Sequence, residues 1–412
     1  MKIRQIDKCQ VNRHFYNKGH VCHKLGLPLF TNRSTMRRNC ILGLFAAALW
    51  MCALPANAGY DTAWLYRRAV NVDNTGGASA LTNLQVLVID TNAVAEISAG
   101  KMEADGADIR VVDSDDATPL DYFLESPGRV WVKIPNIPAL TSKTVYLYYG
   151  NPSAAAVTSA TNTFIRVVDG LVASWHFEEG SGTSAYDSSG FDNTITLYNG
   201  PTWVPEGRHG GGLSLDGIDD SLRAVDNSVL QMKPDGTPYT LFMWIKPNTA
   251  TGESAFVFNK ESAYRFSVAN DDIYVRHFTN NTASVNISKY NVLSAGTWSS
   301  VAAQYDGENI RLCADTSYGS WTSAGPTIGD SSGKVVSIAS KWAKWFYGEC
   351  DEAAIYTNCL SDAELLDLYN NRGYSTTNQP GRMFVRQNAA PEPTITVMAA
   401  ESAIRGIIII VQ

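Results

Sequence analysis

The amino-acid sequence predicts an all-β fold built from two β-sandwich domains. Apolar and polar residues alternate in short runs, among them Leu84–Ile89, Val130–Ile134 and Tyr264–Val268, as expected of strands whose side chains point alternately to two faces. Clusters of turn-forming residues such as Asp73–Gly77 and Asn270–Asp272 separate these runs. Short strands at regular spacing with turn signals between them are typical of antiparallel sandwiches.

A targeting signal stands ahead of the first domain. Met36–Arg38 carries two arginines, an apolar run of 13 residues follows at Cys40–Cys52, and Ala56–Ala58 is a small-x-small cleavage site. This order is typical of a secretory signal peptide, and the run is too short to span a bilayer as a helix. We expect residues 36–58 to direct export and residues 1–35 to be a start-site extension. The mature chain is expected to be extracellular, on the cell surface or periplasmic, without a transmembrane helix.

Composition and charge limit the classes of partner that the protein can bind. The chain has 412 residues, 45% hydrophobic and 18% charged, which is a globular composition with room for more than one domain. Residues 1–58 hold nine of the 33 Lys and Arg but only one of the 40 Asp and Glu, which leaves 24 basic and 39 acidic residues and a formal charge of −15. Such a surface repels nucleic-acid phosphates, so nucleic acid is excluded as a partner, whereas calcium is suitable.

Composition also divides the mature chain into domains. The stretch Asn151–Thr163 is rich in Ala, Ser and Thr, as linkers are. We therefore expect domains at 59–150 and 169–373, joined by a linker at 151–168 and followed by a tail at 374–412.

One helix is predicted, at Ser361–Arg372 near the end of the second domain. Ser361 and Glu364 can form a capping box at its start, and Gly373 can end it.

Several motifs follow one another in order along the second half of the chain. They are Gly170–Gly182, Gly211–Asp220, Thr240–Pro247, Gly296–Gly307 and Phe346–Tyr356. In this order they resemble the laminin-G-like family of concanavalin A-like jelly rolls. The resemblance implies a jelly roll that binds carbohydrate or protein ligands. It also implies one structural calcium at the sandwich rim, with Asp351 and Asp187 as side-chain ligands and carbonyls from Ser188–Gly190.

The first half is similar to a bacterial domain of unknown function, the family numbered 2341. The matching pieces are Trp64–Arg67, Gly106–Arg110, Val130–Pro135 and Val145–Pro152. The family commonly precedes a laminin-G-like domain in exported bacterial proteins, and its role is unsettled.

The stretch Tyr347–Tyr356 raises the question of catalysis, because glycoside hydrolases on the jelly roll use a Glu-x-Asp-x-Glu or Glu-x-Asp-x-x-Glu strand. Glu349 and Asp351 match its first two acids, but Ala353 and Ala354 stand where the third should be. Simple alternation puts Asp351 on one face with Ala353 and Ile355, and Glu352 on the other. We expect no catalytic residues and no enzyme.

Other residue groups carry two interpretations each. Asp219 and Asp220, in Asp216–Asp220, are a second candidate metal site or a polar turn between strands. Cys313, Cys350 and Cys359 remain after signal cleavage. An odd number allows one disulfide, Cys350–Cys359 or Cys313–Cys350; alternatively, Cys313 and Cys350 are small core residues on strands.

Trp342, Trp345 and Trp321 are candidate ligand contacts, because aromatic side chains near polar residues suit saccharide stacking. Together these features favour an exported, non-catalytic bacterial envelope protein that binds glycans or protein partners and is stabilised by calcium. The alternatives are a polysaccharide-acting glycoside hydrolase and an architectural spacer in a surface assembly.

Overall fold

The structure is a computed structural model that describes residues 60–232, 234–248, 255–341 and 344–402, and residues 57–412 form one compact unit. Antiparallel sheets dominate it, which confirms the predicted all-β class with a jelly-roll second domain. The predicted extension and signal peptide lie outside the described residues.

The first sandwich consists of a four-stranded and a three-stranded sheet. The first sheet has the order β29-β1-β6-β3 and the second β2-β5-β4. The bounds are β1 (Tyr66–Asp73), β2 (Leu81–Ile89), β3 (Arg110–Val112), β4 (Tyr122–Ser126), β5 (Arg129–Ile137), β6 (Ser142–Tyr149), β29 (Thr394–Ser402) and the short helix α1 (Ala93–Ser98). Alternate residues of both sheets, such as Val70, Val72, Val130 and Val132, form one buried core.

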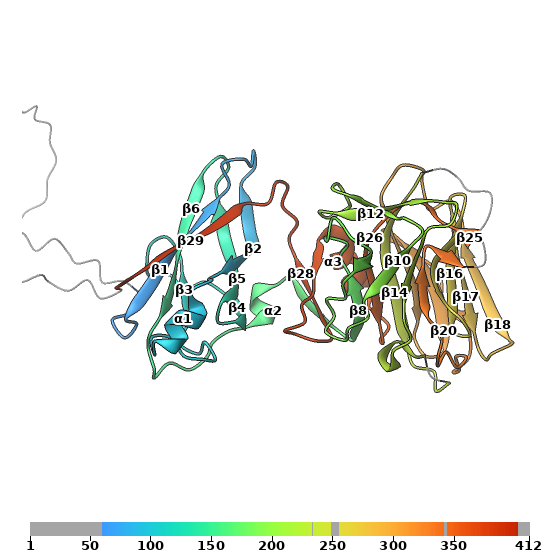
Figure 1. Cartoon of the computed structure of the whole chain (residues 1–412), viewed down its shortest axis with the longest axis horizontal. Helices are drawn as coiled ribbons and strands as arrows, with labels where there is room; N and C mark the ends of the chain where they lie inside the picture. Colours follow the sequence, from blue (N-terminus) through green and yellow to red (C-terminus); the bar gives the residue numbers. More distant parts are fainter. Residues whose placement is uncertain (1–59, 233, 249–254, 342–343, 403–412) are drawn as a thin grey trace, which may run out of the picture. The chain divides into compact units, whose positions relative to one another are not determined.

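The strand β29 comes from the segment expected to be a tail. It pairs antiparallel with β1 over the whole length of that strand, from Tyr66 to Asp73, and Figure 1 shows it in red alongside β1 in blue. Its Ile395 and Val397 pack against the core of the first sandwich. The first sandwich is therefore completed by a strand that follows the jelly roll in the chain, because a pairing partner is chosen by packing and not by sequence distance.

The jelly roll packs an eight-stranded sheet against a nine-stranded one. The eight-stranded sheet runs β18-β17-β16-β15-β23-β13-β10-β9; the nine-stranded sheet runs β11-β12-β26-β14-β19-β20-β21, with β22 on β20 and β8 on β26. Residues of both sheets, including Trp175, Leu241, Phe266 and Ile355, form the largest core of the described part.

The strand bounds of the jelly roll are as follows. They are β8 (Leu171–Trp175), β9 (Ser184–Ala185), β10 (Ile195–Tyr198), β11 (Thr202–Val204), β12 (Gly212–Asp216), β13 (Ser221–Ala224), β14 (Tyr239–Pro247), β15 (Ala255–Lys260), β16 (Tyr264–Ala269), β17 (Asp272–Phe278), β18 (Ser284–Lys289), β19 (Ser299–Tyr305), β20 (Asn309–Ala314), β21 (Ser317–Tyr318), β22 (Thr322–Ser323), β23 (Val336–Ile338) and β26 (Tyr347–Tyr356), with the 3-10 helix η1 (Ser228–Leu230) and the hairpin β24 (Ser340–Lys341) and β25 (Lys344–Trp345).

A third layer covers the outer face of the nine-stranded sheet. It consists of α3 (Asp362–Asn370) and a small sheet of β27 (Arg372–Tyr374), β28 (Arg382–Arg386) and β7 (Arg166–Asp169). Side chains of this layer, among them Leu365 and Met383, pack on Phe242 and Trp244 of β14. Phe384 also joins Phe123, Trp131 and Phe164 in a separate aromatic cluster beside α2 (Ala160–Thr163). The segments expected to be linker and tail thus supply strands to a shared layer.

The predicted helix is present with its capping box. Ser361 Oγ accepts the Glu364 N–H, and Glu364 accepts the Ser361 N–H. The helix ends at Asn370 and not at Gly373 as expected, because Arg372–Tyr374 pairs with β28.

A β-bulge interrupts β26. Opposite it on β14, Trp244 pairs with Asp351 and Phe242 pairs with Ala354, so one residue, Met243, faces two. Glu352 lies in the bulge with a φ of 51°, a left-handed conformation that is uncommon for a residue with a side chain.

The bulge makes the expected alternation wrong on this strand. Ala353 and Ile355 point into the core between the sheets. Asp351 is instead paired with Trp244, a residue of the outer face. Glu352 turns to this same outer side, because one extra residue in a strand shifts every later side chain by one position.

Candidate functional site

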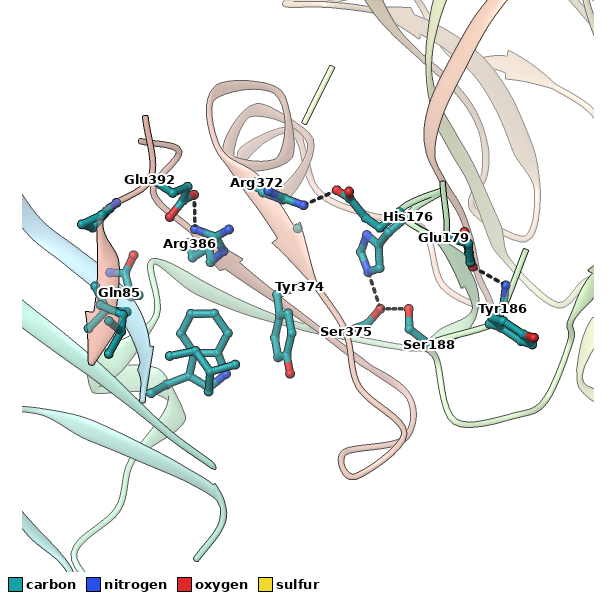
Figure 2. A pocket seen from close by; sticks show the side chains of 17 residues that line it. Gln85, His176, Glu179, Tyr186, Ser188, Arg372, Tyr374, Ser375, Arg386 and Glu392 are labelled. Atoms are coloured by element: carbon teal, nitrogen blue, oxygen red, sulfur yellow. Dashed lines mark hydrogen bonds and ion pairs between the residues drawn. The ribbon is translucent and has the colours of Figure 1, made fainter. Parts of the chain in front are cut away.

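A pocket of about 610 Å³ opens beside β27 (Figure 2). Its lining comes from β2 and β5, from the loops after β8 and β9, from β27 and β28, and from the start of β29 with the segment before it. Trp131, Tyr186 and Tyr374 are its aromatic residues, while Arg372, Arg386, Glu178 and Glu392 are charged. A pocket with mainly apolar and aromatic walls and a few convergent polar groups is the usual form of a small-ligand site.

The aromatic wall includes an unused hydrogen-bond donor. The Trp131 and Tyr374 rings meet edge to face with centroids 4.7 Å apart. The buried Trp131 Nε1 has no hydrogen-bond partner among the described residues, and a buried donor of this kind normally has one. Tyr186 is 66% exposed. Tyr186 therefore presents an exposed ring at the pocket, while the unpartnered Trp131 N–H is itself buried.

Two ion pairs hold the charged groups of the pocket. Arg372 Nη2 lies 2.5 Å from Glu178 Oε1, and Arg386 Nη1 lies 2.8 Å from Glu392 Oε1. Paired in this way, the guanidinium groups and carboxylates present fixed donors and acceptors without a large net charge.

A network of buried polar side chains borders the pocket at His176. Its Nδ1 lies 2.6 Å from Glu352 Oε2, and its Nε2 lies 2.9 Å from Ser375 Oγ. Ser375 Oγ in turn lies 2.6 Å from Ser188 Oγ and 3.0 Å from Ser174 Oγ.

The charges of this network stabilise one another. Burial by itself lowers the pKa of His176, but the carboxylate of Glu352 outweighs burial and raises it. Burial likewise acts to raise the pKa of Glu352, and His176 together with Arg372 holds it below its ordinary value. The favoured state is therefore an imidazolium–carboxylate pair.

Asp187 does not fit the calcium site that the resemblance implies. Its Oδ1 accepts the N–H groups of Ser174 and Ser189 at 3.0 and 2.9 Å, and its Oδ2 accepts the Ser189 hydroxyl and the Asn193 N–H at 2.8 Å each. A carboxylate has about four lone-pair positions, so these bonds leave none for a cation. Asp187 instead ties the loop after β9 to Ser174 of β8.

Asp351 is also engaged by the backbone. Its oxygens accept the N–H groups of Glu352 at 2.7 Å and His209 at 2.9 Å. Burial, followed by the charge of Glu352, raises its pKa well above the ordinary range. Two of its lone-pair positions are therefore already used by backbone donors.

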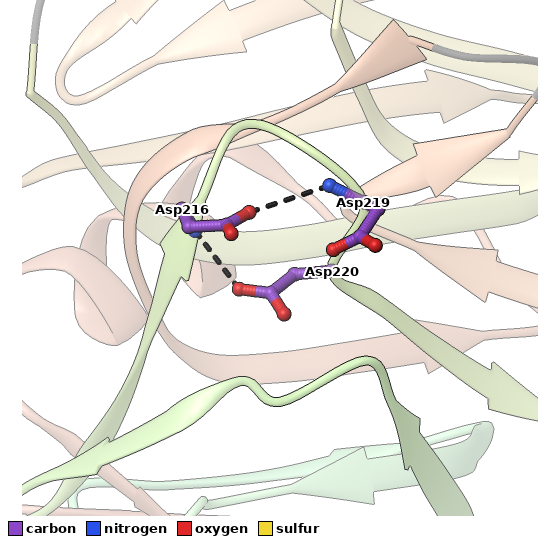
Figure 3. A group of neighbouring side chains, drawn as sticks. All are labelled: Asp216, Asp219 and Asp220. Atoms are coloured by element: carbon purple, nitrogen blue, oxygen red, sulfur yellow. Dashed lines mark hydrogen bonds between the residues drawn. The ribbon is translucent and has the colours of Figure 1, made fainter.

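A different group of carboxylates is suited to a cation. Ligand atoms of Asp216, Asp219 and Asp220 lie within 4.8 Å of one another in the loop between β12 and β13 (Figure 3). Asp220 is 3% exposed, and its Oδ1 has no hydrogen-bond partner among the described residues. Burial, together with Asp216 and Asp219, raises the pKa of Asp220. Calcium binds such sets of carboxylate oxygens, so this loop fits the ion better than Asp351 and Asp187.

The tryptophans proposed from the sequence lie elsewhere. Trp321 is 41% exposed, under the Arg311 guanidinium at 4.4 Å, and Trp345 lies in β25; neither lines the pocket. Trp342 lies outside the described residues. The pocket aromatics were missed because Trp131 sits in an ordinary alternating run and Tyr186 in a polar loop.

The three described cysteines are free thiols, so neither disulfide is present. Cys313 and Cys350 are buried in cores on opposite faces of the nine-stranded sheet. Burial raises the pKa of Cys313 and of Cys359 to about 11. Cys313 and Cys350 are therefore core residues, and a raised pKa argues against a nucleophilic role for any of the three thiols.

Two family models match parts of the chain. Residues 216–366 match Laminin_G_3, described as the concanavalin A-like lectin/glucanases superfamily, and residues 105–200 match the domain of unknown function DUF2341. No curated protein shows a significant match. Among the described residues, no helix is long and apolar enough to cross a membrane.

Several solved structures are similar to about half of this chain. The binding domain of Paraclostridial Mosquitocidal Protein 1 has a TM-score of 0.42 and 14% identity, covering 51% of this chain and 55% of that chain. Domain 4 of AbnA, a GH43 extracellular arabinanase from Geobacillus stearothermophilus in complex with arabinotriose, has a TM-score of 0.40 and 17% identity, covering 49% and 98%. The binding domain of Botulinum neurotoxin DC in complex with rat synaptotagmin II has a TM-score of 0.42 and 12% identity, covering 49% and 51%. The chain spans about half the length of the first and third of these structures.

The two family matches occur in the order expected from the sequence motifs. Residues 216–366 are therefore similar to the concanavalin A-like lectin/glucanases superfamily, and residues 105–200, ahead of most of that match, to the domain of unknown function DUF2341.

Proposed function

We propose that the protein is an exported bacterial envelope protein that binds a saccharide in the pocket beside β27. The lectin and glucanase superfamily supports a binding role, and residues 36–58 support export. The observation that carries the proposal is the aromatic wall with the unpaired Trp131 Nε1. Sugars present apolar ring faces and hydroxyls, which match aromatic rings flanked by fixed charged groups.

Tyr186→Ala is expected to weaken saccharide binding about three- to tenfold, because one stacked aromatic contributes about 0.5–1.5 kcal/mol. The side chain is largely exposed, so the fold should be unaffected. The measurement is titration calorimetry with the oligosaccharide that binds best on a broad glycan array.

Tyr290→Ala is the matched control, since Tyr290 is similarly exposed at 61% but lies away from the pocket. Equal affinities of the Tyr186 variant and the native protein would contradict the proposed site. Absence of binding across the array, with self-assembly of the purified protein, would favour a spacer instead.

We also propose that calcium binds the loop of Asp216, Asp219 and Asp220 and stabilises the jelly roll. The buried, unpartnered Asp220 Oδ1 supports this site, because three close carboxylates repel one another unless a cation lies among them.

Calcium at about 100 times its Kd is expected to stabilise the protein by about 2.7 kcal/mol, and EDTA should remove this gain. Asp220→Asn should abolish the response, whereas Asp330→Asn, in an exposed turn, should keep it. Thermal unfolding with calcium and with EDTA measures both. Identical melting temperatures of the native protein in the two buffers would rule the site out.

A further inference from the structure

The His176 network has the geometry of a catalytic triad. Its three members come from distant segments: His176 directly follows β8, Glu352 stands in the bulge of β26, and Ser375 directly follows β27. The imidazole bridges the other two, with 2.6 Å from Nδ1 to the carboxylate and 2.9 Å from Nε2 to the hydroxyl. In hydrolases of the Ser-His-acid type the imidazole makes the same two contacts, whatever the order of the residues in the chain.

The acid and the hydroxyl of the network are both buried. Glu352 is 6% exposed and Ser375 4% exposed. His176, Ser188 and Ser375 nevertheless line the pocket, and Figure 2 shows Ser375 between His176 and Ser188. A bound molecule would therefore meet the hydroxyl and the imidazole, while the carboxylate stays behind them.

The backbone at Glu352 has a left-handed conformation. Its left-handed φ of 51° is worth roughly 1–3 kcal/mol of strain in a residue with a side chain. The bulge that holds it turns the carboxylate toward His176. Strained residues and bulges cluster at active sites, where they aim a side chain.

We infer that Ser375, His176 and Glu352 form a catalytic triad that hydrolyses carboxylic esters bound in this pocket. The inference shares its pocket with the proposed saccharide site, and an acylated saccharide is one ester that the pocket would accept. The enzyme class differs from the glycoside hydrolase considered from the sequence, since an ester bond and not a glycosidic bond is broken.

The reaction follows from the roles of the three groups. Ser375 Oγ bonds to the ester carbonyl carbon while its proton passes to His176 Nε2. The bond from that carbon to the alcohol oxygen then breaks, and the alcohol leaves with this proton. Water attacks the acyl-serine in the same manner through His176, which releases the carboxylic acid and restores the Ser375 hydroxyl.

Neighbouring groups can stabilise the negative charge that develops on the carbonyl oxygen. The Ser188 hydroxyl lies 2.6 Å from Ser375 Oγ, and it lines the pocket together with the Arg372 guanidinium. Hydroxyl donors and cations fixed near a developing oxyanion are established ways to lower such a barrier.

The protonation of His176 sets the pH dependence. The charged groups that act on it are Glu352 and Glu178, which favour the imidazolium, and Arg372, which opposes it. Its pKa is raised above the ordinary 6.5, and only the neutral imidazole can accept the serine proton. The rate should therefore rise with pH through a pKa above 6.5.

The test uses the purified protein with p-nitrophenyl acetate and p-nitrophenyl butyrate. Hydrolysis above the buffer rate is expected, and Ser375→Ala should lower kcat/KM at least about 100-fold. Ser337→Ala is the control, because Ser337 is a buried serine of β23 that does not line the pocket. The Ser337 variant should keep the native rate.

A covalent probe makes the result independent of any variant's folding. A fluorophosphonate should label the native protein once, on Ser375, as located by mass spectrometry of peptides. No labelling of Ser375 together with no ester hydrolysis would overturn the triad and leave a structural hydrogen-bond network. Saccharide binding without ester hydrolysis would support the proposed function and reject the triad. Ester hydrolysis without saccharide binding would support the triad and reject the saccharide site.

Discussion

Ending the chain at Ala390 is expected to unfold the first sandwich while the jelly roll stays folded. The truncation removes β29, which pairs with every residue position of β1 except one at an irregularity after Arg68. It also exposes the core that Ile395 and Val397 cover and leaves β1 as an open edge. A domain is typically stabilised by only about 5–15 kcal/mol, and a two-layer sandwich of about 100 residues has little stability to spare. Loss of a whole strand with its core contacts is therefore expected to unfold it.

A chain that ends at Ser402 is the matched control, since it keeps all of β29. Hydrogen exchange read out by mass spectrometry should show fast exchange in β1, β6 and β2 of the shorter chain alone. Adding a peptide of residues 391–402 in trans should restore protection by strand addition. Equal protection of the two chains would contradict the role given to β29.

Glu352→Ala is expected to lower the free energy of unfolding by about 3–5 kcal/mol, the usual cost of removing one partner of a buried charge pair. The variant leaves the His176 imidazolium without its 2.6 Å contact and removes the carboxylate that faces Arg372 at 3.9 Å. Relief of the left-handed backbone is not part of this change, because alanine also has a Cβ.

Glu349→Ala, three residues earlier on the same strand, is the matched control. Glu349 pairs with Lys246 at 3.0 Å where both side chains reach solvent, and such pairs contribute about 0–1 kcal/mol. Urea unfolding of the two variants compares their free energies of unfolding. Equal losses would show that the buried pair contributes no more stability than the exposed one.

The loss of unfolding free energy caused by Glu352→Ala should also depend on pH. The raised pKa of His176 adds stability that is complete below its ordinary 6.5 and is lost as the pH rises through the folded value. The lowered pKa of Glu352 adds stability that is complete above its ordinary 4.5 and is lost as the pH falls through the folded value. The largest deficit is therefore expected between about pH 4.5 and 6.5, and it should shrink at alkaline pH.

The sequence was sufficient for the parts of the fold that depend on local pattern. Alternation and turn residues predicted antiparallel sandwiches, and the capping box at Ser361 and Glu364 predicted α3, because these signals arise between residues a few positions apart. The acidic loop at Asp219 and Asp220 was also visible, since its carboxylates are neighbours in the chain.

The parts that failed depend on long-range packing. An extra residue in β26 is invisible in the sequence, so alternation put Asp351 on the core face with Ala353 and Ile355, whereas it lies on the outer face with Trp244. His176 and Ser375 are 199 positions apart, and no local motif joins them. Asp187 looked like a free ligand because its four hydrogen-bond donors are backbone groups and hydroxyls that any loop contains.

The late strand of the first sandwich has a consequence for how the protein is made. Contacts such as that between Arg68 and Met398 join residues 330 positions apart. The jelly roll precedes β29 in the chain, so it is synthesised earlier and can fold first, while one edge of β1 still lacks its partner strand. Folding of the N-terminal half should thus be the slow, final step of biogenesis, and the stage at which a chaperone is needed most.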